Sequence, residues 1–192
     1  MTIPETRSEA TPRWREAARR HELLAAGALA GLLAGTAMMA VAIAAAAWHG
    51  IAPLRPLQLI GETFVGPGAL QGAAKVAFGV GVHALVSAFL GVVFASIAPR
   101  ELAPFAAVGQ GEGFALFVMG VMMTIVVPWV NPGFRDGIQV MGGSFALALG
   151  VFGVVIGVAP ALRRRLSGEA TDAPDTARGL GAAPAAGRAR TT

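Results

Sequence analysis

The chain has 192 residues, of which 55% are hydrophobic and 14% are charged, and its formal net charge is +4. Soluble domains average about 25% charged residues, so this deficit favours a membrane protein over a soluble one. The chain contains no cysteine, which excludes a disulfide framework, a thiolate metal site and a cysteine nucleophile.

The first 22 residues form a basic segment. It carries Arg7, Arg13, Arg15, Arg19 and Arg20. Thr11 followed by Pro12 is typical of a helix start, and Glu16 lies four residues before Arg20, a spacing that stabilises a helix. We therefore predict that 1–22 is a partly helical cytoplasmic segment at the membrane surface.

Four long apolar stretches follow, each suited to crossing a membrane as a helix. Such a helix needs roughly 20 mostly apolar residues to cross about 30 Å of hydrocarbon. The stretches are 23–48, 76–98, 105–130 and 138–162. The first is longer than the apolar core of a signal peptide (about 7–15 residues), so we interpret it as an uncleaved helix. We expect an all-α membrane protein whose residues 23–162 form a bundle of four transmembrane helices.

The loop at 49–75 has a helical pattern of its own. Pro56 is typical of a helix start, and the sequence GPG at 66–68 is typical of a helix end. Three apolar residues between them share one face: Leu57, Ile60 and Phe64. We predict a short amphipathic helix at the outer membrane interface, and the alternative is an irregular loop.

Small residues recur at four-residue spacing in three of the helices, which lets helix backbones approach closely in lipid. The first helix carries Gly27, Gly31 and Gly35. The second carries Gly79, His83, Ser87 and Gly91. The fourth carries Gly142, Ala146, Gly150, Gly153 and Gly157. We interpret these stripes as packing surfaces within the bundle, and the alternative is a homo-oligomer interface.

The stretch TIVVPWVNPGFRDG at 124–137 interrupts the apolar pattern between the third and fourth helices. We expect five residues to shape this outer turn: Pro128, Trp129, Asn131, Pro132 and Asp136. Proline can kink the end of the third helix, tryptophan suits the membrane interface, and Asn-Pro-Gly is typical of a turn. We predict that Asp136 caps the fourth helix. Whether the turn packs against the helix at 57–64 as a lid stays open.

The remaining segment, 163–192, begins with Arg163, Arg164 and Arg165. The tail after Ser167 is rich in Ala, Gly, Pro and Thr, which predicts disorder. Arginines gather before the first helix and after the fourth, so the positive-inside rule places both termini in the cytoplasm of a bacterial inner membrane. These arginines adjoin apolar runs, which favours lipid headgroups over nucleic acid as a partner.

His83 is the ionisable residue of the stretch 76–98. Polar residues inside membranes often function. We interpret His83 as hydrogen-bonded to a serine or a carbonyl of a neighbouring helix, and the alternatives are haem or metal ligation and proton transfer. A haem shared with His49 is disfavoured, because His49 lies at the outer end of the first helix and His83 is about 12 Å deeper. We therefore predict no cofactor, with haem at His83 as the alternative.

Glu112 is the charged residue of the stretch 105–130, and Gln110 lies two residues before it. A buried carboxylate there would serve proton coupling or substrate binding. We favour a simpler interpretation, in which Glu112 lies in the first turn of its helix or reaches the headgroups. A possible intramembrane polar site comprises His83, Ser87, Gln110 and Glu112.

The motifs of soluble enzymes are absent from the sequence. It has no glycine-rich phosphate loop followed by Lys-Ser or Lys-Thr and no HExxH motif. One of the three histidines lies in the basic first segment, so a Ser-His-Asp triad has no plausible assembly. We therefore predict that the chain is not an enzyme.

Several motifs together resemble a group of small bacterial four-helix membrane proteins that have no established activity. They are GALAGLLAG, IAPLRPLQLIGETFVG, VHALVSAFLGVVFASIAP and VVPWVNPGF, and the resemblance covers about residues 24–160. Members of the group often have a histidine in the fourth helix, but that region here reads VMGGSFALALG. The resemblance implies the architecture and no site residue.

The expected function is that of a structural or accessory subunit of a membrane assembly. Its partners would be the lipid bilayer and other membrane subunits or further copies of the chain. One alternative is an oligomeric transporter of small solutes or protons that uses Glu112 and His83. The other is a haem- or quinone-linked electron-transfer subunit with His83.

Overall fold

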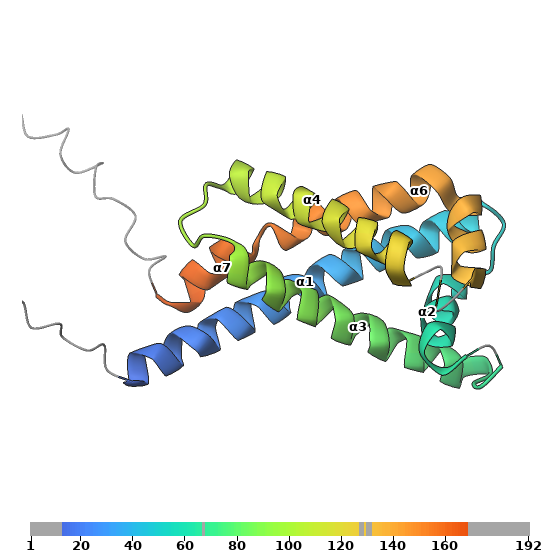
Figure 1. Ribbon diagram of the computed structural model, residues 1–192, viewed down its shortest axis with the longest axis horizontal. Helices are drawn as coiled ribbons and strands as arrows, with labels where there is room; N and C mark the ends of the chain where they lie inside the picture. The colour runs from blue at the N-terminus through green and yellow to red at the C-terminus, as the bar shows by residue number, and fades with distance from the viewer. Residues whose placement is uncertain (1–12, 67, 127–128, 130–131, 169–192) are drawn as a thin grey trace, which may run out of the picture.

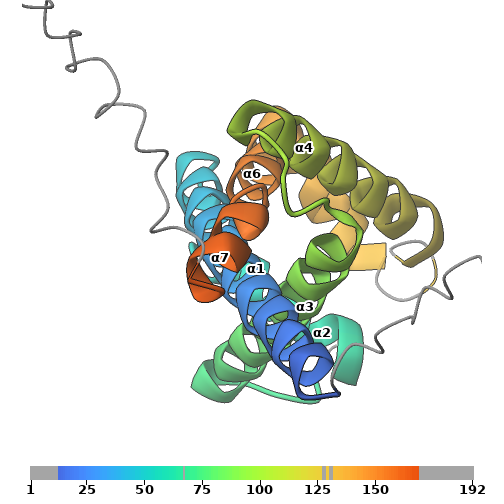
Figure 2. The same cartoon turned by 90° about the vertical axis from the view of Figure 1, so that its left-hand side faces the viewer.

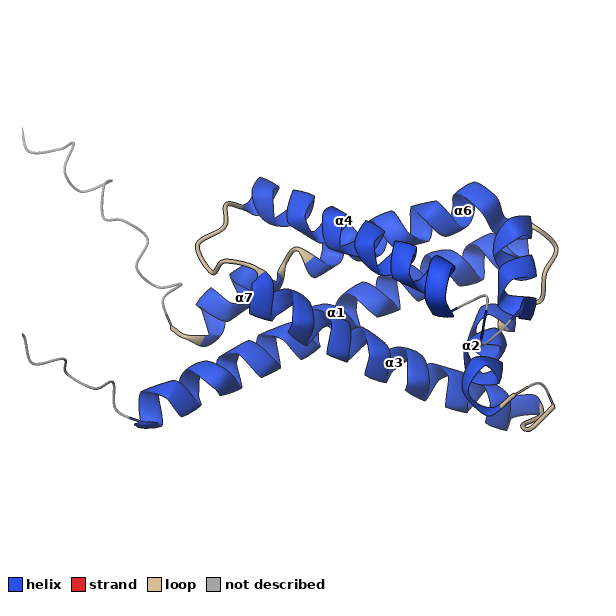
Figure 3. Cartoon of the chain, viewed as in Figure 1, coloured by secondary structure: helices blue, strands red, loops and turns tan. Residues whose placement is uncertain are grey.

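The structure is a computed structural model that describes residues 13–66, 68–126, 129 and 132–168. Within these ranges all the regular elements are helices (Figure 1, Figure 3). In chain order they are α1 (Arg13–Trp48), α2 (Arg55–Val65), α3 (Gly72–Ile97), α4 (Pro104–Val121), the π-helix η1 (Met122–Val126), α6 (Pro132–Ile156) and α7 (Ala159–Leu166). The predicted all-α class is confirmed.

Among the described residues, four segments are long and apolar enough to cross a membrane. They are Glu16–Trp48, Gly72–Ile97, Pro104–Ile125 and Gly142–Leu166. The second and third lie close to the predicted stretches. The fourth begins later than expected, because α6 is kinked at Gly142 and the span starts there. It continues through α7 to Leu166.

The first helix starts earlier than the predicted membrane span. α1 is continuous over 36 residues, which corresponds to about 54 Å and exceeds the hydrocarbon thickness of about 30 Å. Its first turns are rich in Ala, Arg, Glu and Leu, which are strong helix formers, and they contain neither Gly nor Pro before Gly27. The basic segment and the first span are therefore one helix.

The helices pack around α1. It contacts α3, α6 and α7, whereas α4 packs its backbone against α6 (Figure 2). The largest core joins these elements through buried Ala, Phe, Leu and Ile side chains. Within it, the rings of Phe94 on α3 and Phe114 on α4 lie 5.4 Å apart at 54°, a favourable tilted arrangement. Side chains therefore link α3 to α4.

Glycines let α1 and α3 touch through their backbones. A Cβ atom added at Gly31 would overlap the carbonyl oxygen of Ser87, and one added at Gly91 would overlap that of Gly27. Gly35 faces the Ser87 side chain in the same way. This contact is the close approach that the four-residue spacing predicts.

Gly79 belongs to the same stripe of α3 but faces a different helix. A Cβ atom at Gly79 would overlap the carbonyl oxygen of Leu57 on α2, and one at Gly61 of α2 would lie 3.2 Å from the carbonyl oxygen of Lys75. Thus α2 lies across the start of α3. On α2, Leu57 is buried whereas Phe64 is 62% exposed, so the predicted apolar face of α2 is only partly the packed one.

The contact between α4 and α6 also relies on glycine. A Cβ atom at Gly111 would overlap the carbonyl oxygen of Gly153, and one at Gly157 would lie 2.8 Å from that of Ala107. The first two members of the predicted α6 stripe, Gly142 and Ala146, are exposed. The prediction that these two residues pack within the bundle is therefore wrong.

α6 is broken at Gly142, where φ is +39° and ψ is −114°. A positive φ is accessible to glycine at little steric cost. The segment 132–141 therefore turns away from the rest of α6, toward the end of the bundle at which α2 lies (Figure 1). We call this the α2 end. There α2 contacts α1, α3 and α6.

The predicted outer turn is only partly described. Pro128 and Asn131 lie outside the described residues, and Trp129 is 85% exposed. α6 begins at Pro132, so Asp136 lies inside the helix. The prediction that Asp136 caps the fourth helix is therefore wrong, because the helix starts one turn earlier.

At the opposite end, which we call the arginine-rich end, two α7 arginines bind main-chain carbonyls. Arg163 donates from Nη1 to the carbonyl oxygens of Ala95 (2.9 Å) and Ala98 (3.2 Å). Arg164 donates from Nη1 to the carbonyl oxygen of Arg100 at 2.6 Å. The last carbonyls of a helix lack intrahelical donors, so these arginines tie α7 to the end of α3.

Candidate functional site

His83 lies in the middle of α3, on the face that packs against α1. Its Nε2 is 3.0 Å from the carbonyl oxygen of Gly35. Ser87, one turn later, is 3% exposed and lies against the same glycine. This is the expected hydrogen bond to a carbonyl of a neighbouring helix. While that bond is present, Nε2 is not available to ligate a metal.

His49 follows α1 and contacts a different helix. Its Nε2 lies 3.2 Å from Oγ of Ser144, two residues after the Gly142 break. Gly35, the partner of His83, lies thirteen residues before Trp48 on α1, which is about 20 Å along the helix. The two histidines therefore lie at different levels along α1.

Glu112 lies between α4 and α6. Because α4 begins at Pro104, Glu112 is in the third turn, and the first-turn interpretation is wrong. Its carboxylate lies over Gly153 and Gly150: Cβ atoms added there would lie 2.8 Å from Oε2 and 3.9 Å from Oε1. The two glycines therefore make room for the carboxylate. Within the described part of the chain, Glu112 has no hydrogen bond or ion pair.

Gln110 is on the same helix as Glu112 but on another face. Its Oε1 atom is buried and meets no donor among the described residues. The structure thus places Gln110 and Glu112 on α4 and places His83 and Ser87 at the α1–α3 contact. The four residues of the predicted polar site do not form one cluster.

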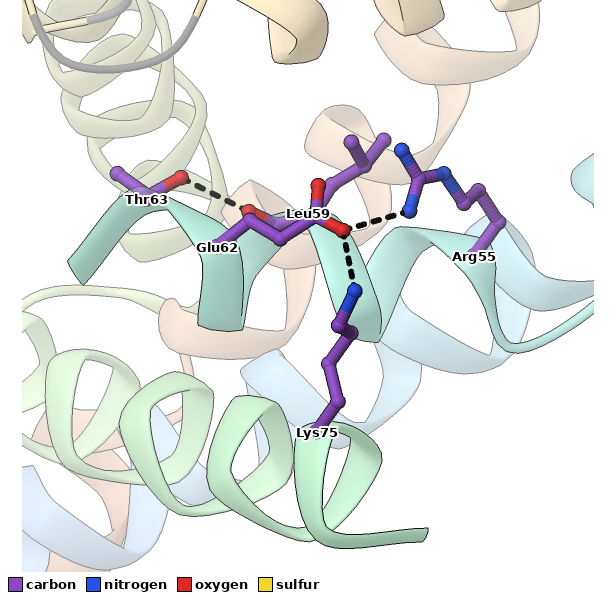
Figure 4. A network of polar contacts seen from close by, with 5 residues as sticks. All are labelled: Arg55, Leu59, Glu62, Thr63 and Lys75. Carbon is purple, nitrogen blue, oxygen red and sulfur yellow. Dashed lines mark hydrogen bonds and ion pairs between the residues drawn. The ribbon is translucent and has the colours of Figure 1, made fainter. Parts of the chain in front are cut away.

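A second polar network lies at the α2 end (Figure 4). Oε1 of Glu62 on α2 accepts hydrogen bonds from Nζ of Lys75 at 2.7 Å and from Nη1 of Arg55 at 2.9 Å. Thr63 donates from Oγ1 to the carbonyl oxygen of Leu59 at 2.9 Å, within α2. Sequence reasoning missed this network, although Arg55 and Glu62 are two helical turns apart and therefore share a face.

The Glu62 network fastens α2 to α3. The hydrogen bond from Lys75 lowers the pKa of Glu62, burial opposes this effect, and Arg55 lowers the pKa further. The carboxylate is 10% exposed and Lys75 is 17% exposed, so the pair is partly shielded from water. Together with the Gly79–Leu57 contact, it fixes where α2 lies.

The face of α4 that points away from α6 carries small residues. Ala106, Gly109, Gly113 and Gly120 are exposed. A Cβ atom added at any of these glycines would meet no described atom within 4 Å. Their spacing of three, four and seven residues places them on one face. This outward face of α4 was also missed, although Gly109 and Gly113 form a GxxxG pattern in the sequence.

Among the described residues no group of three or more His, Cys, Asp or Glu side chains is arranged to hold a metal ion. Comparisons of the chain with protein-family models, with curated proteins and with solved structures found no match. The resemblance to small bacterial four-helix membrane proteins therefore stays a prediction. The exposed glycines of the outward face of α4 make this face the candidate functional site.

Proposed function

We propose that the chain is a non-enzymatic multi-pass membrane protein that serves as a subunit of a larger membrane assembly. In this proposal a helix of a neighbouring subunit packs on the outward face of α4. The observation that supports it is the row of exposed glycines formed by Gly109, Gly113 and Gly120.

The reasoning rests on what glycine does in a lipid-facing helix. Lipid chains are as apolar as leucine, so helices associate through close packing, and small residues allow it. A glycine in a helix interior is less favourable than alanine by about 0.5–1 kcal/mol. Several other helical glycines meet another backbone, as Gly31 meets Ser87 and Gly111 meets Gly153, whereas Gly81 does not. A partner helix would give the α4 glycines the same role.

Replacement of Gly113 by leucine tests this proposal. The added side chain points into open space among the described residues, so the fold should remain and helicity by circular dichroism should be unchanged. Gly81→Leu is the matched control, because Gly81 is also exposed and uncovered, but on α3. Native mass spectrometry after mild extraction should show complexes larger than the 19.5 kDa chain for the wild type and Gly81→Leu, and a monomer for Gly113→Leu.

Two outcomes would contradict this proposal. One is a wild-type chain that is monomeric and without associates after mild extraction. The other is equal assembly of Gly113→Leu and Gly81→Leu.

We further propose that the arginine-rich end faces the cytoplasm of a bacterium and that α2 lies at the outer surface. Arginines of α7 and of the α3–α4 loop support this orientation, because basic residues near span ends favour the cytoplasmic side. Since the chain has no cysteine, single cysteines report sidedness directly. Phe64→Cys should react with an impermeant thiol reagent in intact cells, and Glu101→Cys should react after lysis.

A proton- or solute-coupled transporter is a second candidate. The observation that favours it is the position of Glu112, three turns into α4 and against Gly150 and Gly153 of α6. In liposomes, Glu112→Gln should abolish pH-dependent flux, whereas Glu101→Gln, which removes an exposed carboxylate, should retain it. Absence of flux from the wild type, or equal flux from both variants, would reject this candidate.

A further inference from the structure

Positive charge is concentrated at the arginine-rich end. In the described part of the chain this end carries eight arginines: Arg13, Arg15, Arg19, Arg20, Arg100, Arg163, Arg164 and Arg165. It carries three glutamates: Glu16, Glu22 and Glu101. At the α2 end, Arg55, Lys75 and Arg135 are nearly balanced by Glu62 and Asp136. The arginine-rich end therefore has a large excess of positive charge.

Internal contacts account for some of these arginines. Arg163 and Arg164 bind main-chain carbonyls of the α3 end and the following loop. Arg100 lies 3.9 Å from a carboxylate oxygen of Glu22. The side chains of Arg19, Arg20 and Arg165 are exposed. These three guanidinium groups can reach a ligand outside the chain.

Two of the exposed arginines lie near the same place in the fold. Leu23 of α1 and Leu162 of α7 pack against one core, and α7 lies beside α1 (Figure 2). Arg19 is one turn before Leu23 on the same face of α1. Arg165 is three residues after Leu162 and so lies about one turn further along α7. Both arginines therefore lie about one turn beyond residues that pack against the same core, on helices that contact each other.

The neighbours of these arginines are apolar and exposed. Leu24 is one turn after Arg20 and is 50% exposed, and Leu166, next to Arg165, is 52% exposed. The apolar spans Glu16–Trp48 and Gly142–Leu166 end here. A ligand at this place would meet guanidinium groups on one side and apolar side chains on the other, which is the arrangement of a phospholipid at a membrane boundary.

We propose that the arginine-rich end binds an anionic glycerophospholipid. The lipid phosphate contacts Arg19, Arg20 and Arg165, and its acyl chains lie along Leu24 toward the middle of the span. Arginine suits this role because its planar guanidinium group donates two parallel hydrogen bonds to phosphate oxygens. The chemistry recognised is a phosphate ester, so free phosphate is the other possible source of the ligand.

The purified full-length chain in neutral detergent provides the test. Phosphatidylglycerol and phosphatidylcholine with identical acyl chains are added in equal amounts, and native mass spectrometry measures the ratio of the two bound lipids. The triple variant Arg19→Gln/Arg20→Gln/Arg165→Gln should lower the wild-type preference for phosphatidylglycerol by about tenfold or more. The corresponding lysine variant should retain part of the preference, because it keeps the charge.

A charge-matched control separates a site from a general effect of net charge. Arg178, Arg188 and Arg190 lie outside the described residues, and their replacement by glutamine removes the same charge; this variant should keep the wild-type preference. An equal loss in both triple variants, or a wild type without preference, would overturn the proposal. Millimolar inorganic phosphate should leave the preference unchanged, and its abolition by phosphate would show that the site takes free phosphate instead.

Discussion

Replacement of Glu62 by glutamine tests whether the Glu62 network holds α2 on the bundle. Glu62 is 10% exposed, and its partners Lys75 and Arg55 are 17% and 39% exposed. Exposed ion pairs contribute about 0.2–1 kcal/mol, whereas removal of one partner from a buried pair costs about 3–5 kcal/mol. The solvent exposure of the Glu62 network is intermediate between an exposed and a buried ion pair, and glutamine at position 62 still offers a hydrogen-bond acceptor. We therefore expect α2 to lose about 1–2 kcal/mol of docking free energy.

The absence of cysteine from the chain provides the assay. Leu59 of α2 is 6% exposed, so a thiol introduced by Leu59→Cys should react with a maleimide when α2 leaves the bundle. A loss of 1–2 kcal/mol in docking should raise the labelling rate about 5–30-fold. Glu16→Gln, which removes an exposed carboxylate from α1, is the control for charge. Equal labelling rates with and without Glu62→Gln would refute the reasoning.

Acid should weaken the same network. The pKa of Glu62 is held below its ordinary value of 4.5, chiefly by the hydrogen bond from Lys75. A carboxyl group with a lowered pKa stabilises the fold above its ordinary pKa, and that contribution is lost as the pH falls through the lowered value. Below pH 4.5, hydrogen exchange of α2 amides in the wild type should therefore approach that of Glu62→Gln at the same pH. A constant difference across this range would contradict the prediction.

Three further substitutions test the packing. Gly91→Leu should push α1 and α3 apart and cost about 1–3 kcal/mol or more, seen as a lower midpoint of denaturant-induced unfolding; Gly81→Leu should leave the midpoint unchanged. Arg163→Gln should remove donors from the carbonyls of Ala95 and Ala98 and cost about 1–3 kcal/mol, with faster hydrogen exchange at the end of α3 than in Arg165→Gln. Gly142→Ala should be strained by about 1–2 kcal/mol at a positive φ, and distances between spin labels on 132–141 and α2 should change, whereas Gly143→Ala should leave them unchanged.

The sequence was sufficient to predict the number and order of the long apolar helices in the described part of the chain. A membrane-spanning helix satisfies its own backbone hydrogen bonds, so its signal is local and lies in the apolar run itself. The glycine spacing also pointed correctly to close contacts at Gly31 and Gly91. Both features depend on residues that are near one another in the chain.

Features that depend on distant residues were harder to predict. The sequence shows that Gly79 permits a close approach, but not that its neighbour is Leu57 rather than α1. The first-turn interpretation of Glu112 required a helix that starts close to this residue, whereas α4 starts at Pro104, eight residues before Glu112 and close to the predicted start at 105. The four-residue spacing predicted that Gly142 packs against another helix, whereas in the structure Gly142 has a positive φ and kinks α6. One residue type serves both purposes, so spacing alone does not distinguish them.

The packing of α4 on α6 has a consequence for the order of assembly during synthesis. Chains emerge from the ribosome N-terminus first, so α1 meets its partner α3 early, whereas α4 is complete before α6 exists. In a membrane, Glu112 would therefore leave the ribosome before Gly150 and Gly153, the residues that make room for its carboxylate. Until α6 arrives, α4 is a candidate span whose Glu112 carboxylate has no glycine surface to lie against.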